Sequence, residues 1–103
     1  MISMHKKVTP TSTPIKHPQI VLREEFDKWG LLFDPDQGLA YGINPVGIFI
    51  WKHLDGKHTP QDLFRLVQKE FDQVPDGSQE DITEFIQTVV DKGYAGFEVK
   101  NDH

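Results

Sequence analysis

Histidine is the residue type in this chain with the widest scope for chemistry, because imidazole can ligate a metal ion or transfer a proton near neutral pH. The sequence contains five histidines, and most of them lie near the chain ends. Only His53 and His58, with Asp55 between them, come from the body of the chain. A protein metal site needs more converging ligands than these. We therefore predict solvated loop histidines and no metal site.

Carboxylates form two groups that could supply a general acid and a general base. They are Glu24, Glu25 and Asp27, and Glu80, Asp81 and Glu84. Catalytic carboxylates need burial or crowding by like charges to tune their pKa values, whereas these residues fall at a predicted strand edge and a predicted helix start. The absence of cysteine excludes thiolate catalysis, disulfides and cysteine-based metal sites. We predict no catalytic residues, no cofactor and no enzymatic activity.

The chain is acidic overall, with 26% charged residues and a formal net charge of -5. Nucleic-acid-binding modules are usually basic, with Lys and Arg concentrated on one face, and the basic residues here are scattered. No apolar run approaches the roughly 20 residues needed to span a bilayer, and the N-terminus lacks the apolar core of a signal peptide. The composition predicts a cytoplasmic, soluble protein that binds neither nucleic acid nor membrane.

Residues 39 to 54 are the stretch around which the other elements must be arranged. Residues 39 to 43 alternate as a strand does, with large apolar side chains at every second position. Asn44-Pro45 then has the residue types of a helix N-cap and first helical position. The helix that follows is apolar on most sides, which predicts a central position, and we expect it to end at Gly56.

Two further strands are predicted upstream, at residues 20 to 26 and 29 to 33, and a turn at residues 34 to 38. A connection of five residues would gather the large side chains of the hairpin on one face, and a slip of one residue would scatter them. The predicted register pairs Phe33 with Leu39, Leu31 with Tyr41, and Trp29 with Ile43. The sheet is then a three-stranded antiparallel meander with its apolar face against the helices.

Two more helices are predicted after the central one. Thr59 caps a helix that runs to about Phe71, and Ser78 caps a last helix that closes at Lys92-Gly93. The apolar stripes of these helices are Leu63, Leu66, Val67 and Phe71, and Ile82, Phe85, Ile86, Val89 and Val90. The predicted fold class is α+β, a three-stranded antiparallel meander packed on a three-helix bundle.

The chain ends are predicted to lack stable structure. Residues 1 to 18 carry three prolines among polar residues and should form an extended, disordered tail. Residues 19 to 99 should form one domain, in which residues 94 to 99 add a short extended segment against the core. Residues 100 to 103 should fray.

The strand at residues 39 to 43 should be an edge strand with one unpaired side. Proteins usually protect such an edge with charge or proline, and this strand has neither. Its Ala40 and Gly42 leave the backbone accessible. A helix or the C-terminal segment could cover the edge. If it is open, an incoming peptide could pair there by strand addition, or a second copy of the chain could form a homodimer.

The order and spacing of these signals resemble the pyrroloquinoline-quinone biosynthesis protein D family (PqqD-like), over roughly residues 18 to 97. The matching segments are LLFDPDQG at the hairpin, an Asn before the first helix, IWKHLDG at its end, TPQDL at the next helix start and DITEFI in the third helix. The resemblance implies three strands packed on three helices in a winged-helix-like arrangement.

The resemblance also implies a function, that of a RiPP recognition element, a non-catalytic chaperone for ribosomally made peptides. Such a protein binds the leader segment of a precursor peptide as an added strand and presents it to a radical SAM (S-adenosylmethionine) maturase. Carried onto this chain, the peptide-binding residues are Leu39, Ala40, Tyr41, Gly42 and Ile43 of the third strand, and Phe85, Val89 and Lys92 of the third helix. The wide apolar stripe of that helix suits both a core and a groove.

Two alternative functions follow from the residues. A winged-helix regulator would bind nucleic acid, with its second and third helices joined by a short turn. The exposed side of the third helix is mostly acidic, however, which repels phosphate. A small metal-dependent enzyme is the other alternative, and the scattered histidines disfavour it.

Overall fold

The computed structural model describes residues 7–25, 28–71 and 78–97 of the chain. The fold is α+β, with three helices, a three-stranded antiparallel sheet and a second sheet of two strands. The elements are β1 (Pro14–Lys16), β2 (Val21–Glu24), β3 (Gly30–Asp34), β4 (Leu39–Ile43), α1 (Pro45–Lys52), α2 (Pro60–Glu70), α3 (Gln79–Asp91) and β5 (Ala95–Phe97). The predicted fold class is therefore confirmed, while the winged-helix likeness stays a prediction.

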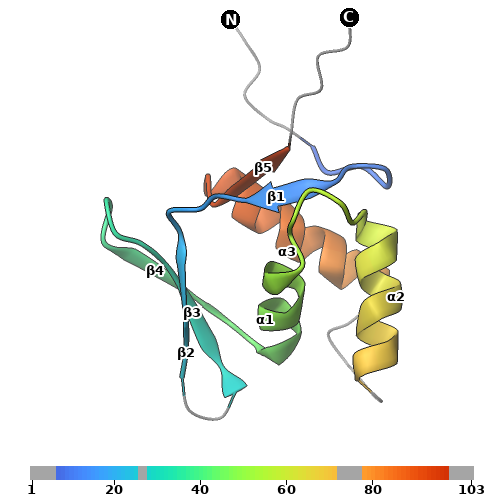
Figure 1. The fold of residues 1–103 in the computed structure, drawn as a ribbon, viewed down its shortest axis with the longest axis horizontal. Helices are drawn as coiled ribbons and strands as arrows, with labels where there is room; N and C mark the ends of the chain where they lie inside the picture. The colour runs from blue at the N-terminus through green and yellow to red at the C-terminus, as the bar shows by residue number, and fades with distance from the viewer. Residues whose placement is uncertain (1–6, 26–27, 72–77, 98–103) are drawn as a thin grey trace, which may run out of the picture.

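The three-stranded sheet has the order β2-β3-β4, as predicted for a meander. The sheet lies at one end of the molecule and α2 at the other, with α1 between them (Figure 1). The two-stranded sheet of β1 and β5 lies apart from it, beside α3 (Figure 1). The central position predicted for the helix after Asn44 is confirmed.

The register predicted for the hairpin of β3 and β4 is wrong by one residue. Asp34 pairs with Leu39, so that Leu32 lies opposite Tyr41 and Gly30 opposite Ile43. Asp34 belongs to β3 and is not part of the turn, which leaves a connection of only Pro35 to Gly38.

Hydrogen bonds at the turn explain this register. The carbonyl of Asp34 accepts the N–H of Gln37 at 3.2 Å and that of Gly38 at 2.8 Å. The Asp34 carboxylate also accepts the N–H of Asp36 at 3.0 Å. Gly38 has a φ of 71°, a conformation that favours glycine and brings the chain back in register with Asp34. These bonds stabilise the shorter connection.

In the observed register Leu39, Tyr41 and Ile43 share a face of the sheet with Leu32 of β3 and not with Leu31 and Phe33. Leu32 is buried against the helices, whereas Leu31 and Phe33 lie on the opposite face and are partly exposed. A Cβ at Gly30 would lie only 3.0 Å from Cδ1 of Ile48, so β3 and α1 approach each other closely at this glycine. The expected gathering of all large side chains on one face is therefore also wrong.

The predicted helix caps are confirmed. The side chain of Asn44 accepts the N–H of Gly47 at 2.8 Å, with Pro45 at the first helical position. Thr59 and Ser78 each form a capping box with the acidic residue three positions later. Two orphan N–H groups are satisfied at each of these helix starts, which explains why short helices begin where the sequence indicates.

The first helix ends earlier than predicted, at Lys52 and not at Gly56. The chain after Lys52 bonds to β1 instead of continuing the helix. The carbonyl of Leu54 accepts the N–H of Lys16 at 2.9 Å, and the N–H of Gly56 donates to the carbonyl of Pro14 at 3.0 Å. Gly56 has a φ of 82° and serves this turn.

The prediction of a disordered tail is wrong for Pro14–Lys16, which forms β1 and pairs with β5. Pro14 is fully buried, and Val8 packs into the core. The folded unit therefore begins before the predicted boundary at residue 19. The extended segment predicted at residues 94 to 99 is confirmed for Ala95–Phe97, whereas residues 1–6 and 98–103, including the predicted frayed end, lie outside the described residues.

The core lies between the three helices and the inner face of β3 and β4. Its largest fully buried apolar side chains are Leu32, Ile50, Leu54, Leu63, Val67, Ile82, Ile86 and Val89. Burial of such side chains is the main favourable term in folding. Within the described ranges, every helix is too short or too polar to cross a bilayer.

Candidate functional site

The strand β4 is an edge strand. It pairs with β3 on one side, and in the part of the chain that the structure describes no other strand pairs with it. The C-terminal strand β5, one of the segments that could have covered this edge, pairs with β1 instead. The prediction that β4 is an edge strand, with one side unpaired by any other described strand, is therefore confirmed.

The backbone groups of Ala40 and Gly42 point toward the open side. The N–H of Glu25 donates to the carbonyl of Trp29 at 2.7 Å, in the hairpin of β2 and β3. Because bonded and non-bonded pairs alternate along an antiparallel ladder, the odd-numbered residues of β3 bond to β2 and the even-numbered ones to β4. Leu31 lies opposite Gly42, so Gly42, and Ala40 two residues before it, direct N–H and C=O away from β3.

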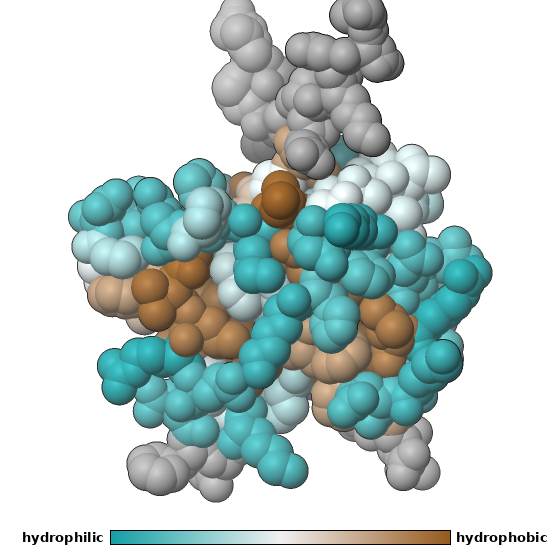
Figure 2. Space-filling view, in the orientation of Figure 1, coloured by the Kyte–Doolittle hydropathy of each residue, from teal (hydrophilic) through white to brown (hydrophobic). Residues whose placement is uncertain are grey.

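The strand β4 carries no charged side chain of its own. Leu39 is 60% exposed, Tyr41 is half-buried and Ile43 belongs to the core. Val21 of β2 and Trp29, which precedes β3, are also exposed, but they lie on the opposite face of the sheet. Figure 2 shows apolar side chains at the surface on the side of the molecule where this sheet lies. An edge without charge, proline or cover favours pairing with another chain.

The predicted helical residue Phe85 lies beside the end of β4. It is half-buried, and a Cβ at Gly47 would lie 3.4 Å from its Cε1. A hollow of about 180 Å³ opens here between α1 and α3. It is lined by Asn44, Val46, Gly47, Ile50, Asp81, Ile82 and Phe85. The hollow is large enough for one apolar side chain.

The other end of α3 contacts the middle of β4. The Nζ atom of Lys92 lies 4.8 Å from the centroid of the Tyr41 ring. Such a cation–π contact is worth about 0.5 to 1 kcal/mol at an exposed site. Lys92 therefore contacts β4 through Tyr41, and Phe85 lies at the hollow with Asn44, the residue after β4. Their role in peptide binding stays a prediction.

Val89 does not line the groove, because its side chain is 0% exposed. It shares the buried face of α3 with Ile82 and Ile86, at spacings of four and three residues. Assigning Val89 to the peptide-binding residues is therefore wrong for its side chain. Within the predicted apolar stripe Phe85 and Val90 are half-buried, and of these two Phe85 lines the hollow.

Sequence reasoning missed several residues of this site. Asp81 lines the hollow, and Thr88 lies on the same helical face, between Phe85 and Lys92. The spacing of four, three and four residues from Asp81 to Lys92 was the signal that could have identified this face. Val46 and Ile50 of α1 also line the hollow, but nothing local in the sequence separates them from core residues.

His53 and His58 lie close together without forming a metal centre. Their ring centroids are 5.7 Å apart. Nδ1 of His53 bonds to the carbonyl of Phe49 at 2.8 Å, and Nδ1 of His58 to the carboxylate of Asp55 at 3.0 Å. The described residues contain no cluster of three or more side chains suited to a metal ion.

The pKa of Asp55 is lowered by its hydrogen bonds in the loop that contains His58. Partial burial acts to raise it, but hydrogen bonds from the N–H of Lys57 and from His58 outweigh burial and hold the pKa below 3.8. The carboxylate is therefore a structural anchor for the loop and stays ionised near neutral pH.

Comparison with known proteins adds to this geometry. A lasso peptide synthetase B1 in complex with a leader peptide is similar in structure, with a TM-score of 0.64 and 19% identity over 82% of this chain and 98% of that chain. TbiB1 in complex with the TbiA(beta) leader peptide has a TM-score of 0.61 and 19% identity over 85% and 99%.

At this identity the two structures establish the likeness of fold. No curated protein matches the sequence. The family model of coenzyme PQQ synthesis protein D matches residues 30–95, from β3 to the start of β5. Because this match spans more than half of the chain, the protein belongs to the PqqD family.

Proposed function

We propose that this protein is a non-catalytic peptide chaperone that binds the leader segment of a ribosomally made precursor peptide. The leader pairs with β4 as an added strand and places alternate side chains in the groove between β4 and α3. The observation that carries this proposal is the open edge, where Ala40 and Gly42 direct backbone donors and acceptors outward.

The comparisons support this binding mode. The two similar solved structures are both complexes with leader peptides, and their fold extends over most of this chain. In the present chain the edge strand β4 begins with the exposed Leu39, and the hollow opens at Asn44, directly after its other end. A leader peptide can use all three features at once, with backbone pairing for affinity and the hollow for specificity.

The size of the site is consistent with moderate affinity. A few leader side chains would be buried at about 1.5 to 3 kcal/mol each, less the cost of ordering the peptide, which gives roughly micromolar binding. This affinity suits a carrier that must release its peptide. We propose that the receiving partner is a radical SAM maturase, in line with the resemblance of the sequence.

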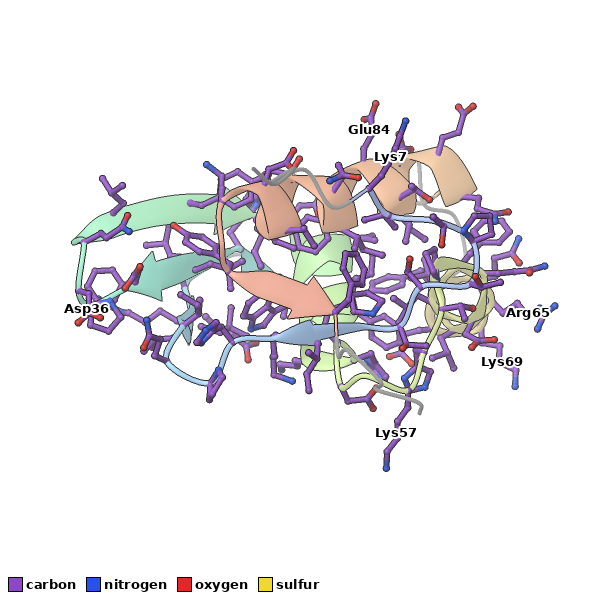
Figure 3. All side chains as sticks on the ribbon, turned by 90° about the horizontal axis from the view of Figure 1, so that it is seen from above. Lys7, Asp36, Lys57, Arg65, Lys69 and Glu84 are labelled. Atoms are coloured by element: carbon purple, nitrogen blue, oxygen red, sulfur yellow. The ribbon has the colours of Figure 1, made fainter. Side chains whose placement is uncertain are left out.

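Nucleic acid is a poorer ligand for the same fold. The exposed side chains of α3 include Glu80, Glu84 and Asp91, and their charge repels phosphate. The basic residues Arg65 and Lys69 lie on α2, at the end of the molecule away from the three-stranded sheet (Figure 3).

The test is a titration of the isotope-labelled protein with a leader peptide from a precursor gene that neighbours a maturase gene. We expect shifts of the backbone amides of residues 39 to 43, and of Phe85 and Lys92, with little change on the exposed side of α2. Saturable binding that leaves the β4 amides unchanged would overturn strand addition. Co-elution of maturase, protein and leader tests the partner, and binding of the leader to the maturase alone with equal affinity would contradict a carrier role.

A further inference from the structure

One face of α3 contacts β4 at its C-terminal end and continues beside α1, and it differs in charge at its two ends. Asp81, Phe85, Thr88 and Lys92 share this face, at helical spacings of four, three and four residues. Lys92 reaches the Tyr41 ring in the middle of β4. The hollow places the opposite end of this face, with Asp81 and Phe85, beside α1 and beside Asn44, the residue that follows β4.

The length of this face matches a short strand segment. Asp81 and Lys92 are eleven residues apart on the helix, which corresponds to about 16 Å. A strand rises about 3.3 Å per residue, so about five residues of an added strand cover the same distance. Every second side chain of that strand faces the groove. One such side chain meets the Lys92 end, one lies near Phe85, and one meets the Asp81 end.

The Asp81 end suits a long side chain with a cationic head. The hollow there has apolar walls from Val46, Ile50 and Phe85, with the Asp81 carboxylate among them. Asp81 is half-buried, and its Oδ2 accepts the N–H of Ser78 at 3.4 Å. Lysine and arginine bury their methylenes along apolar surface and keep the charge at a polar rim.

The charged residues outside the groove do not change the signs of charge at its two ends, negative at Asp81 and positive at Lys92. Glu84 projects from the outer side of α3, away from the body of the protein (Figure 3), and adds negative potential to the half of the helix that holds Asp81. At the other end, the carboxylate of Asp91 accepts a hydrogen bond from Gln87 at 3.0 Å, on the exposed side of the helix. Lys92 is left as the cation that faces β4.

From these positions we infer that the groove selects leader segments by the order of their charges. An acidic side chain lies at the Lys92 end, an apolar side chain lies beside Phe85, and a lysine or arginine lies at the Asp81 end. This inference rests on the proposed function and specifies the class of peptide.

The direction in which the leader pairs with β4 determines the order of these three side chains in the leader sequence. Antiparallel strand pairs outnumber parallel ones, and β4 runs from the Lys92 end toward the Asp81 end. An antiparallel leader runs the opposite way, so its order from the N-terminus is basic, any residue, apolar, any residue, acidic.

Two capped synthetic peptides of identical composition test the inference. One has the central order Lys-Thr-Leu-Thr-Glu and the other its reverse, each with the same neutral flanking residues. Affinity is measured from the β4 amide shifts in low salt. We expect the first peptide to bind about five- to tenfold more tightly, because two surface ion pairs replace two repulsions. The ratio should fall toward unity in about 1 M salt, where the Debye length is about 3 Å.

Two variants locate the effect. Lys92→Glu should abolish the preference, because the acidic end of the first peptide then meets a like charge. Lys69→Glu makes the same change of charge on α2, at the far end of the molecule from the groove (Figure 3), and should leave the preference intact. Circular dichroism and the wild-type amide pattern confirm that each variant is folded.

The outcomes separate this inference from the proposed function. Equal affinities with normal β4 shifts, or tighter binding of the reversed peptide, overturn the charge order and leave strand addition standing. If neither peptide shifts the β4 amides, the charge order is also overturned. The leader titration described above then decides whether strand addition fails as well.

Discussion

The ammonium nitrogen of Lys92 lies 4.8 Å from the centroid of the Tyr41 ring, and so joins the end of α3 to the middle of β4. Cations are attracted to the face of an aromatic ring, which favours this spacing between helix and strand. Farther along the groove, Phe85 approaches the first turn of α1 at Gly47. Contacts of α3 with β4 and with α1 thus hold together elements that are distant in sequence.

Gly42→Pro should weaken leader binding by about tenfold or more, because it removes an outward N–H that a paired strand needs. The fold should survive, since proline is tolerated where the N–H of an edge strand faces solvent. Gly42→Ala is the matched control. A Cβ at this position would meet only Cδ2 of Leu31 at 3.9 Å, so this variant should bind like the wild type. Calorimetry of binding, with circular dichroism as a check of folding, measures both effects.

Phe85→Ala should mainly lower the affinity for the leader, whereas Val89→Ala should mainly lower the stability of the fold. Phe85 is half-buried at the hollow, so its truncation should lower leader affinity more than stability. Val89 is fully buried, so its truncation should lower the free energy of unfolding by about 2 kcal/mol and leave the affinity of the folded protein nearly unchanged. Urea unfolding and leader titration of both variants give the comparison. Equal losses of affinity in the two variants would contradict the placement of Val89.

The unpaired edge also predicts competition between leader and self-association. Two copies can pair through β4, because the strand has no charge or proline to prevent it. We expect a concentration-dependent homodimer, measured by sedimentation velocity, that the leader peptide converts to monomer. Gly42→Pro should weaken this dimer. A dimer that binds the leader without dissociating would show that the dimer interface lies elsewhere.

Local signals in the sequence predicted the helices well, whereas the register needed information from the turn. Asn44, Thr59 and Ser78 each accept the hydrogen bond expected of an N-cap. Asp34 looked like a turn residue, and only its carbonyl bonds to Gln37 and Gly38 reveal that the strand includes it. Alternation of apolar residues could not settle this, because large side chains occupy both faces of β3.

The candidate site was predicted only in part, because sequence signals report on neighbouring elements and not on pairing between distant ones. The open edge follows from strand order, which short connections determine. The strand β1 could not be predicted, because Pro14–Lys16 pairs with β5, about eighty residues away in the chain. Its composition resembles that of a tail, and only the partner strand and the loop at Leu54 supply the hydrogen bonds that order it.

Stability should decline in acid partly through Asp62. Its pKa is held below 3.8, chiefly because its carboxylate accepts the backbone N–H of Thr59. A carboxylate with a lowered pKa in the folded state contributes stability above its unfolded value and loses it as the pH falls through the folded value. The melting temperature of the wild type relative to Asp62→Ala should thus be constant above pH 3.8 and decrease below it. A difference in melting temperature between the wild type and Asp62→Ala that stays constant from about pH 6 to about pH 2 would contradict this role.

Asn44→Ala should disturb both the fold and the groove, because Asn44 ends β4, caps α1 and lines the hollow. Loss of the bond to the N–H of Gly47 should lower the free energy of unfolding by about 1 kcal/mol. Asn44→Asp is the matched control, since a carboxylate can accept the same bond and interacts favourably with the helix N-terminus. Asn44→Asp should therefore keep wild-type stability in urea unfolding. If both variants lose the same stability, the side-chain amide donates an essential bond and does not serve only as the acceptor of the cap.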